Sequence, residues 1–358
     1  MDNTIASLLT LLRISLDSTD NTASGIVEMS NDAVHIAYHQ EVVALVYYAI
    51  QKLYESGYDA VVDKDIKLRL VKQALTQESQ YKSNLKSMKK ISDLFESEGI
   101  IMYVLKGVSI AQYYPQPQYR FSCDMDCLLA DLNKNHFESR FEEGNVLIES
   151  KGVSVHRDYY KHSDFRVGSL YVENHKFCCS VKRGKRTKEL ETYLQGLLNP
   201  NLAEKMDGLY FPSLMFQAIF LIEHACSHFL YEKINLKHMC DWAMFRKANI
   251  DLMDWPEFRK QCEKFKLLNF VDAMNSLADV ILGNKEYAEL TSLERRVFDD
   301  SLQVVTYVES KSIRRFRKAF GILKSGWKFK HFGHSSMIKE LVTSFFAYMF
   351  ENDPKLTE

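Results

Sequence analysis

Two aspartates separated by one residue lie inside an apolar run, and this pair constrains the chain more than any other feature. The run covers residues 123–129 and reads Cys-Asp-Met-Asp-Cys-Leu-Leu. In an extended strand alternate side chains share a face, so Asp124 and Asp126 point the same way. Two carboxylates this close raise each other's pKa unless a cation lies between them. Because oxygen ligands at this spacing suit Mg²⁺, the pair predicts a metal site on a buried strand.

The segments around the aspartates predict a small mixed α/β unit. Residues 100–105 form a continuous apolar run typical of a buried strand, and Lys106-Gly107 follows as a turn. The pattern then predicts a short helix over 109–114, a strand over 123–130, a helix over 133–143, and further strands over 153–177 with turns at 162–163 and 168–169.

Helical periodicity dominates both ends of the chain. It covers residues 1–95 and resumes after Lys188, with helices expected over 214–231, 237–246 and 337–350. We therefore expect an α+β fold in which a small mixed-sheet core over 96–185 is flanked by α-helical regions over 1–95 and 186–358.

Composition excludes several classes of protein. The formal net charge of −1 over 358 residues gives no global field that would recruit nucleic acid or an anionic membrane. The longest apolar run, residues 42–50, is too short to span a bilayer, and the first residues lack the cationic start of a secretory signal. Seven cysteines without paired spacing predict no disulfide framework. A cytoplasmic protein without a membrane partner is the expectation.

Four motifs occur in an order that is more specific than any one of them. They are Val104-Leu105-Lys106-Gly107, Arg120 before Asp124-Met125-Asp126, Val172-Glu173-Asn174-His175, and His224-x-x-x-His228 followed by Lys237-His238-x-x-Asp241. On these motifs residues 95–245 resemble the uncharacterised bacterial nucleotidyltransferase family called family 5, a branch of the polymerase β-like nucleotidyltransferases.

That resemblance implies a nucleotidyltransferase core and a Mg²⁺- or Mn²⁺-dependent reaction. A nucleoside monophosphate would pass from a nucleoside triphosphate (NTP) to a hydroxyl acceptor on a small molecule, a protein or an RNA. Asp124, Asp126 and Glu173 would be the catalytic, metal-binding residues. The residues that would hold phosphates are Lys106, Gly107, Ser109 and Arg120.

The sequence departs from the superfamily pattern at the glycine turn. Val108 stands where most members have serine directly after the glycine, and the gap from Gly107 to Asp124 is slightly longer than usual. A catalytically inactive protein that binds a nucleotide or a partner in the same pocket is therefore the alternative function.

Several candidate residues allow two readings. Glu173 would either complete the metal site or face solvent, and His175 on the same strand face would orient a carboxylate, contact substrate or be held by a hydrogen bond. Arg120 would either bind phosphate or pair with an acid. His224 and His228 share a helix face; a structural link to Asp241 is preferred for them, a substrate pocket comes second and a zinc site third.

Two further clusters carry weaker signals. Residues 182–188 hold five basic side chains without interleaved aromatics, so a solvated linker is favoured over nucleic-acid binding. An aromatic and basic cluster near the C-terminus predicts either core packing or a lid over the site; its members are Trp327, Phe329, His331 and Phe332.

Overall fold

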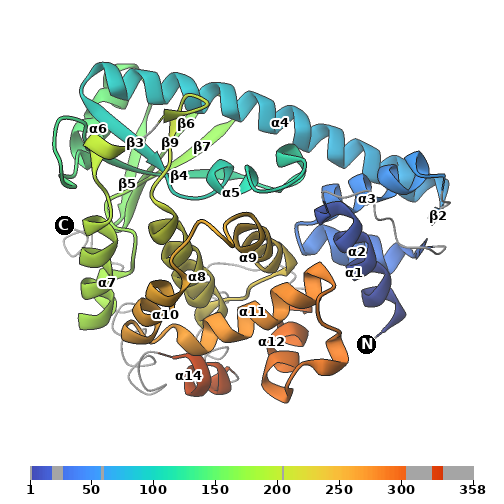
Figure 1. The fold of residues 1–358 in the computed structure, drawn as a ribbon. Helices are drawn as coiled ribbons and strands as arrows, with labels where there is room; N and C mark the ends of the chain where they lie inside the picture. Colours follow the sequence, from blue (N-terminus) through green and yellow to red (C-terminus); the bar gives the residue numbers. More distant parts are fainter. Residues whose placement is uncertain (1, 18–26, 58–59, 204, 304–324, 334–358) are drawn as a thin grey trace.

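The protein is built on a seven-stranded mixed sheet with helices on both faces (Figure 1). The computed structural model describes residues 2–17, 27–57, 60–203, 205–303 and 325–333. The strands follow the order β5-β6-β7-β4-β3-β9-β8. Their bounds are β3 (Ile100–Val104), β4 (Asp124–Asp131), β5 (Val155–Tyr159), β6 (His162–Val167), β7 (Leu170–His175), β8 (Lys205–Met206) and β9 (Leu209–Tyr210). An α+β fold with flanking helices is confirmed.

The central strand β4 separates two apolar cores. Alternate residues Met125, Cys127 and Leu129 pack with the long helix α4 (Lys64–Ser97) and with α6 (Phe141–Ser150). The intervening residues Leu128 and Ala130 belong to the core on the opposite face, which includes α8 (Leu214–Tyr231). Because β4 is covered on both sides, a charged side chain within it requires a partner.

Helices from both ends of the chain share the second core. The N-terminal region holds the helices α1 (Asn3–Leu16), α2 (Asn31–His39) and α3 (Val43–Glu55). Strand β1 (Val27–Met29) lies between α1 and α2, and β2 (Ala60–Val62) follows α3; the two strands pair as a parallel sheet. Buried residues of α1 and α3 are in the same core as those of α9 (Leu236–Ala248) and α11 (Leu268–Leu282). Figure 1 shows the dark-blue α1 beside the orange α11. The three-region division at residues 95 and 185 stays a prediction.

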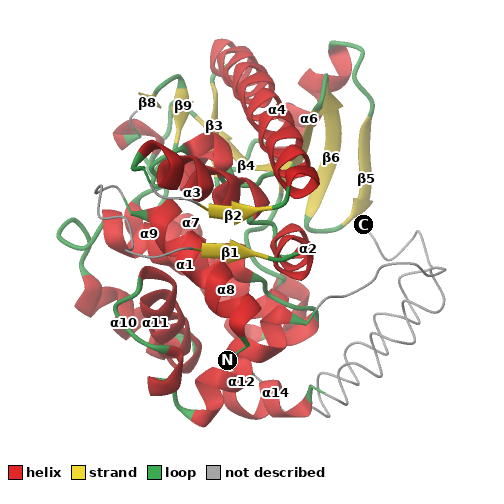
Figure 2. Ribbon diagram, turned by 90° about the vertical axis from the view of Figure 1, so that its right-hand side faces the viewer, coloured by secondary structure: helices red, strands yellow, loops and turns green. Residues whose placement is uncertain are grey.

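The remaining helices of the described residues lie below the long helix α4 in the view of Figure 1, and Figure 2 shows most of them below α4 as well. They are α5 (Val108–Ala111), α7 (Lys185–Gly196), α9 (Leu236–Ala248), α10 (Trp255–Lys264), α11 (Leu268–Leu282), α12 (Ser292–Leu302) and α14 (Gly326–Phe332), with short 3-10 turns at 117–119, 181–183, 200–202 and 287–289.

Most of the predicted elements are present, with local corrections. Strands β1, β2, β8 and β9 lie in regions for which only helices were expected, and β8 and β9 join the main sheet. The helix expected over 133–143 is wrong, since α6 begins only at Phe141. The segment before it forms a loop: Asp131 accepts a hydrogen bond from the Asn133 amide and pairs with Arg140. His162 lies in strand β6 rather than in a turn, which falls at residues 160–161. The helix predicted over 337–350 lies outside the described residues.

Candidate metal centre

The alternation of β4 and its pairing with β7 bring the acidic residues together. Asp124 and Asp126 share the strand face that Met125 and Cys127 avoid. The parallel register of β4 and β7 places Asp126 directly opposite Glu173, and Asp124 opposite Tyr171. Leu128 lies opposite His175, so this histidine is on the same face as Glu173. One face of two neighbouring strands therefore carries all four polar side chains.

Asp126, Glu173 and His175 form a compact group. His175 Nε2 lies 2.8 Å from Asp126 Oδ1 and 3.5 Å from Glu173 Oε2. One potential ligand atom from each of the three residues lies within 4.8 Å of the others. The other ring nitrogen, His175 Nδ1, faces the Phe177 carbonyl at 3.1 Å. Because a carbonyl only accepts, Nδ1 carries a proton and fixes the direction in which Nε2 points.

Lys106 places its ammonium group against the two aspartates. It follows β3, which pairs with β4, and its Nζ lies 3.1 Å from Asp126 Oδ2 and 3.8 Å from Asp124 Oδ2. A third contact, 3.5 Å long, joins the same nitrogen to His224 Nε2 on α8. The lysine thus lies between the sheet and the C-terminal helices.

Two opposing effects set the pKa values in this group: burial favours the neutral form of each side chain, and contact with an opposite charge favours the charged form. Burial alone would lower the pKa of Lys106, but the charges of Asp126, Asp124 and Glu173 outweigh it and raise that pKa. Burial tends to raise the pKa of Asp126, whereas Lys106 and His175 lower it overall. For His175, burial is outweighed by its hydrogen bonds to Asp126 and Glu173, so its pKa is raised. Asp126 is therefore ionised and lies between the Lys106 ammonium and the His175 imidazole.

The residues present fit a divalent ion. Asp126 Oδ2 is buried and has no hydrogen-bond partner among the described residues, although the Lys106 ammonium faces it. Two carboxylates suit Mg²⁺ or Mn²⁺, and an imidazole whose far nitrogen donates to a carbonyl is a common metal-ligand arrangement. The Asp126 and His175 side chains are 1% and 3% exposed, but Glu173 is 22% and Asp124 29% exposed. The group is therefore reachable from solvent through its rim.

The structure groups the predicted metal ligands differently from the sequence. Asp126 and Glu173 come together as expected, but the third member of the compact group is His175 rather than Asp124. Asp124 stands at the edge, joined to the group through Lys106. His162 adds a second imidazole, with Nε2 3.7 Å from Glu173 Oε2. No motif in the sequence indicates His162, because only the pairing of β6 with β7 brings it near.

The predicted phosphate-binding residues lie in three different environments. Gly107 has a φ of +75°, and a Cβ there would come 3.1 Å from Ser122 Oγ, so the turn requires glycine. Ser109 is fully buried, and its hydroxyl has no hydrogen-bond partner among the described residues. Arg120 is also buried and donates from Nε and Nη2 to the two oxygens of Asp241, at 2.9 and 2.8 Å. Pairing with an acid, the alternative stated for Arg120, is what the structure shows.

The preferred link between Asp241 and the histidines His224 and His228 is wrong, because Asp241 has other partners. Asp241 Oδ1 accepts a 2.7 Å hydrogen bond from the Tyr114 hydroxyl in addition to its two bonds from Arg120. His224 instead contacts Lys106, and His228 Nδ1 lies 3.2 Å from Glu232, the residue that follows α8. The guanidinium is the stronger partner for a buried carboxylate because it matches both oxygens.

A row of imidazoles lines the helical side of the group. The ring centroids of His224 and His228 are 4.5 Å apart, and those of His228 and His238 are 5.8 Å apart. Burial and the Lys106 charge lower the pKa of His224. Burial and the Lys237 charge lower that of His238. The neutral imidazole of His224 therefore faces the lysine, and among the described residues none of these three histidines belongs to a compact ligand group.

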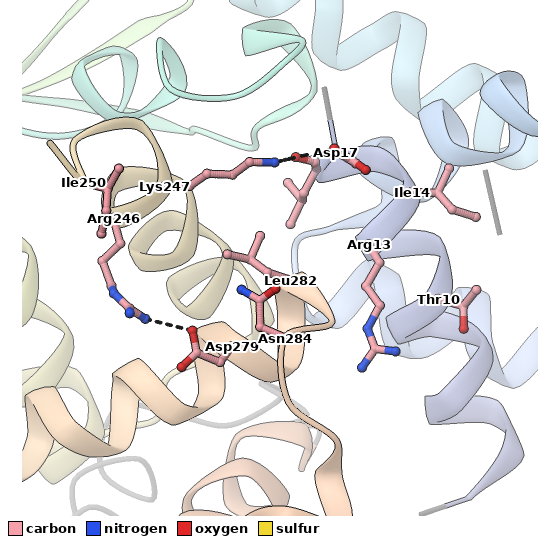
Figure 3. A pocket seen from close by; sticks show the side chains of 11 residues that line it. Thr10, Arg13, Ile14, Asp17, Arg246, Lys247, Ile250, Asp279, Leu282 and Asn284 are labelled. Carbon is pink, nitrogen blue, oxygen red and sulfur yellow. Dashed lines mark hydrogen bonds and ion pairs between the residues drawn. The ribbon is translucent and has the colours of Figure 1, made fainter. Parts of the chain in front are cut away.

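A separate cavity of about 660 Å³ opens where the C-terminal ends of α1, α9 and α11 meet (Figure 3). None of the predicted site residues lines it. Arg13 donates to the Val280 carbonyl, Lys247 pairs with Asp17, and Arg246 pairs with Asp279. The three basic side chains at the cavity therefore pair with acids or donate to a carbonyl at a helix end.

The two weaker sequence clusters have structural roles. In the basic run, Arg186 pairs with buried Glu223 at 2.5 Å and donates to the Phe265 carbonyl. The late aromatic cluster packs on α8, with the Trp327 and Phe332 rings 5.7 and 5.5 Å from that of Phe229. Core packing is therefore observed for this cluster. No helix among the described residues is long and apolar enough to cross a bilayer.

Comparison with protein families decides the assignment. A family model described as uncharacterised nucleotidyltransferase matches residues 30–283, which span the sheet, the carboxylate group and α8 to α11. The chain belongs to this family. No curated protein and no solved structure matches it. A nucleotidyltransferase family and a group of two carboxylates and a histidine together support metal binding at this face of the sheet.

Proposed function

We propose that this protein transfers a nucleoside monophosphate from an NTP to a hydroxyl acceptor in a reaction that depends on Mg²⁺ or Mn²⁺. The observation that carries the proposal is the Asp126–Glu173–His175 group on paired strands of a nucleotidyltransferase-family chain. When bound, a divalent ion supplies the positive charge that triphosphate oxygens and a leaving pyrophosphate require.

The remaining roles, holding the ion and holding the phosphates, would belong to side chains and backbone of this protein. Asp126 and Glu173 would hold the ion, with Asp124 at the exposed edge toward the incoming nucleotide. His175 would be the third ligand, since its ring is fixed from the far side by the Phe177 carbonyl. The Gly107 turn and Lys106 would hold phosphates. Arg120 is left out of this role because two of its nitrogens already donate to Asp241.

The test is pyrophosphate release from each of the four NTPs with Mg²⁺ or Mn²⁺ and a panel of hydroxyl acceptors. We expect release with at least one pair of NTP and acceptor, and a loss of at least about a hundredfold in Glu173→Gln. Glu142→Gln is the matched control, since Glu142 is an exposed acid on α6 that pairs with Arg157. A Glu173→Gln protein that keeps full activity would refute the proposed metal role.

A nucleotide-binding protein without catalysis is the second candidate. It is favoured by Val108 at the usual serine position and by the burial of Ser109, which together leave the two positions after Gly107 without an accessible hydroxyl. Metal-dependent NTP binding without pyrophosphate release across the acceptor panel would support this candidate. Calorimetric titration of each NTP with and without Mn²⁺ measures the binding.

A further inference from the structure

Lys106 occupies the position in which a metal-binding site would hold its cation. Its ammonium lies 3.1 Å from Asp126 Oδ2 and 3.8 Å from Asp124 Oδ2, and the lysine side chain is only 19% exposed. Asp126 Oδ1 is taken by His175 at 2.8 Å. Each oxygen of Asp126 therefore already has a side-chain nitrogen of the protein itself as its neighbour.

A divalent ion and this ammonium compete for the same carboxylate edge. Mg²⁺ requires oxygen ligands at about 2.0–2.1 Å and carries two charges. An ammonium held within hydrogen-bond range of the same oxygen would repel such an ion and block its approach. For the ion to reach Asp126 Oδ2, the lysine has to withdraw.

The structure also offers Lys106 a second partner. His224 on α8 places Nε2 3.5 Å from Nζ, and its imidazole is neutral, so it can accept a hydrogen bond from the ammonium. This contact comes from the helical region, whereas the carboxylates come from the sheet. His224 therefore gives the ammonium a partner that does not compete with metal binding.

We propose that Lys106 is a resident cation that holds Asp124 and Asp126 together in the metal-free protein and withdraws toward His224 when a divalent ion binds. The proposal rests on the metal site of the proposed function. It assigns His224 as a positioning residue for the lysine. It also couples metal and nucleotide, because a withdrawn ammonium is free to contact a triphosphate that arrives with the ion.

The proposal predicts opposite effects of two substitutions on Mn²⁺ binding to the nucleotide-free protein, measured by calorimetry and by the Mn²⁺ paramagnetic resonance signal. Lys106→Met removes the competitor and should tighten Mn²⁺ binding by about tenfold or more. His224→Leu removes the alternative partner and should weaken Mn²⁺ binding severalfold. In the Lys106→Met background, His224→Leu should have no further effect, because the residue on which it acts is absent.

Lys205→Met is the matched control. Lys205 also pairs with two carboxylates, those of Asp93 and Glu96, but at the α4 face of the sheet. Its loss should leave Mn²⁺ affinity unchanged. Thermal unfolding provides a second readout: metal-free Lys106→Met should melt below wild type, and saturating Mn²⁺ should remove the difference. If Lys106→Met does not fold, Lys106→Gln replaces it.

Two failures are distinguishable. If the wild type binds Mn²⁺ and Lys106→Met binds it equally or more weakly, the resident-cation proposal is overturned while the metal site stands. If wild type, Lys106→Met and Lys205→Met all fold but none binds Mn²⁺, the metal site of the proposed function fails, and this proposal fails with it.

Discussion

The buried pair of Arg120 and Asp241 makes a quantitative prediction about stability. Arg120 precedes the carboxylate strand and Asp241 lies on α9, so the pair ties the sheet to the helical region. The two side chains are 6% and 3% exposed, and Tyr114 donates a third hydrogen bond to Asp241. Arg120→Met would leave a buried carboxylate with one neutral donor. We expect a loss of about 3–5 kcal/mol in the free energy of unfolding.

That loss is a large share of the stability of a typical protein, about 5–15 kcal/mol. Urea denaturation followed by far-ultraviolet circular dichroism measures it. The double variant Arg120→Met/Asp241→Leu removes both charges and should recover most of the loss, since no unpaired group remains. Arg259→Met is the control: its partner is Asp272, both side chains are about half exposed, and the expected change is below about 1 kcal/mol.

A loss below about 1 kcal/mol for Arg120→Met, or a double variant at least as unstable as the sum of the two single variants, would refute this reasoning. The same double variant separates the two readings of Arg120. If the arginine only joins the sheet to α9, the double variant keeps its metal-dependent NTP affinity. If the arginine also binds phosphate, that affinity falls although the fold is restored.

Three further predictions concern the metal group, the glycine turn and acid stability. Glu173→Gln should weaken Mn²⁺ binding by about tenfold or more, whereas Glu142→Gln should not, as calorimetry will show. Gly107→Ala should lower the free energy of unfolding by about 1–3 kcal/mol in urea melts because φ is positive there and the added Cβ approaches Ser122 Oγ. The lowered pKa of His238 means that the unfolded chain binds the proton more readily, so stability should fall as pH drops below about 6.5, by up to about 1.4 kcal/mol per pH unit. His238→Gln should make that fall shallower, and a slope identical to wild type in urea melts across this range would contradict the assignment.

Local periodicity predicted the elements well where it was unambiguous. Helix α8 has the predicted bounds of 214–231, and β4 at 124–131 lies one residue from the predicted strand. Cys127 lies on the face away from the aspartates, as two-residue alternation requires. The helix expected over 133–143 failed because tertiary contacts of Asp131 with Arg140 hold that segment as a loop, and because the acids favourable to a helix start, Glu142 and Glu143, come later.

Periodicity did not predict which residues of distant segments contact each other. Arg120 and Asp241 are 121 residues apart, and Lys106 and His224 are 118 apart. Each residue was a candidate on its own motif, but the sequence did not show which pairs would form. Only the packing of α8 and α9 against the sheet decides that Asp241 takes the arginine and His224 the lysine.

Strand register explains why the metal group differs from the predicted set of three carboxylates. Pairing Asp126 with Glu173 places His175 two residues farther along the same face, opposite Leu128, and leaves Asp124 opposite Tyr171. A shift of the β4–β7 register by two residues would bring Asp124 opposite Glu173 instead, while keeping every side chain on its face. The sequence pattern is compatible with both registers, because it fixes the face but not the pairing. The observed register places a histidine beside Asp126 and an aspartate at the rim, where Lys106 reaches it. The choice of ligands therefore depends on the strand pairing, and comparing Mn²⁺ affinity in Asp124→Asn and His175→Gln would test it: the histidine substitution should weaken binding more.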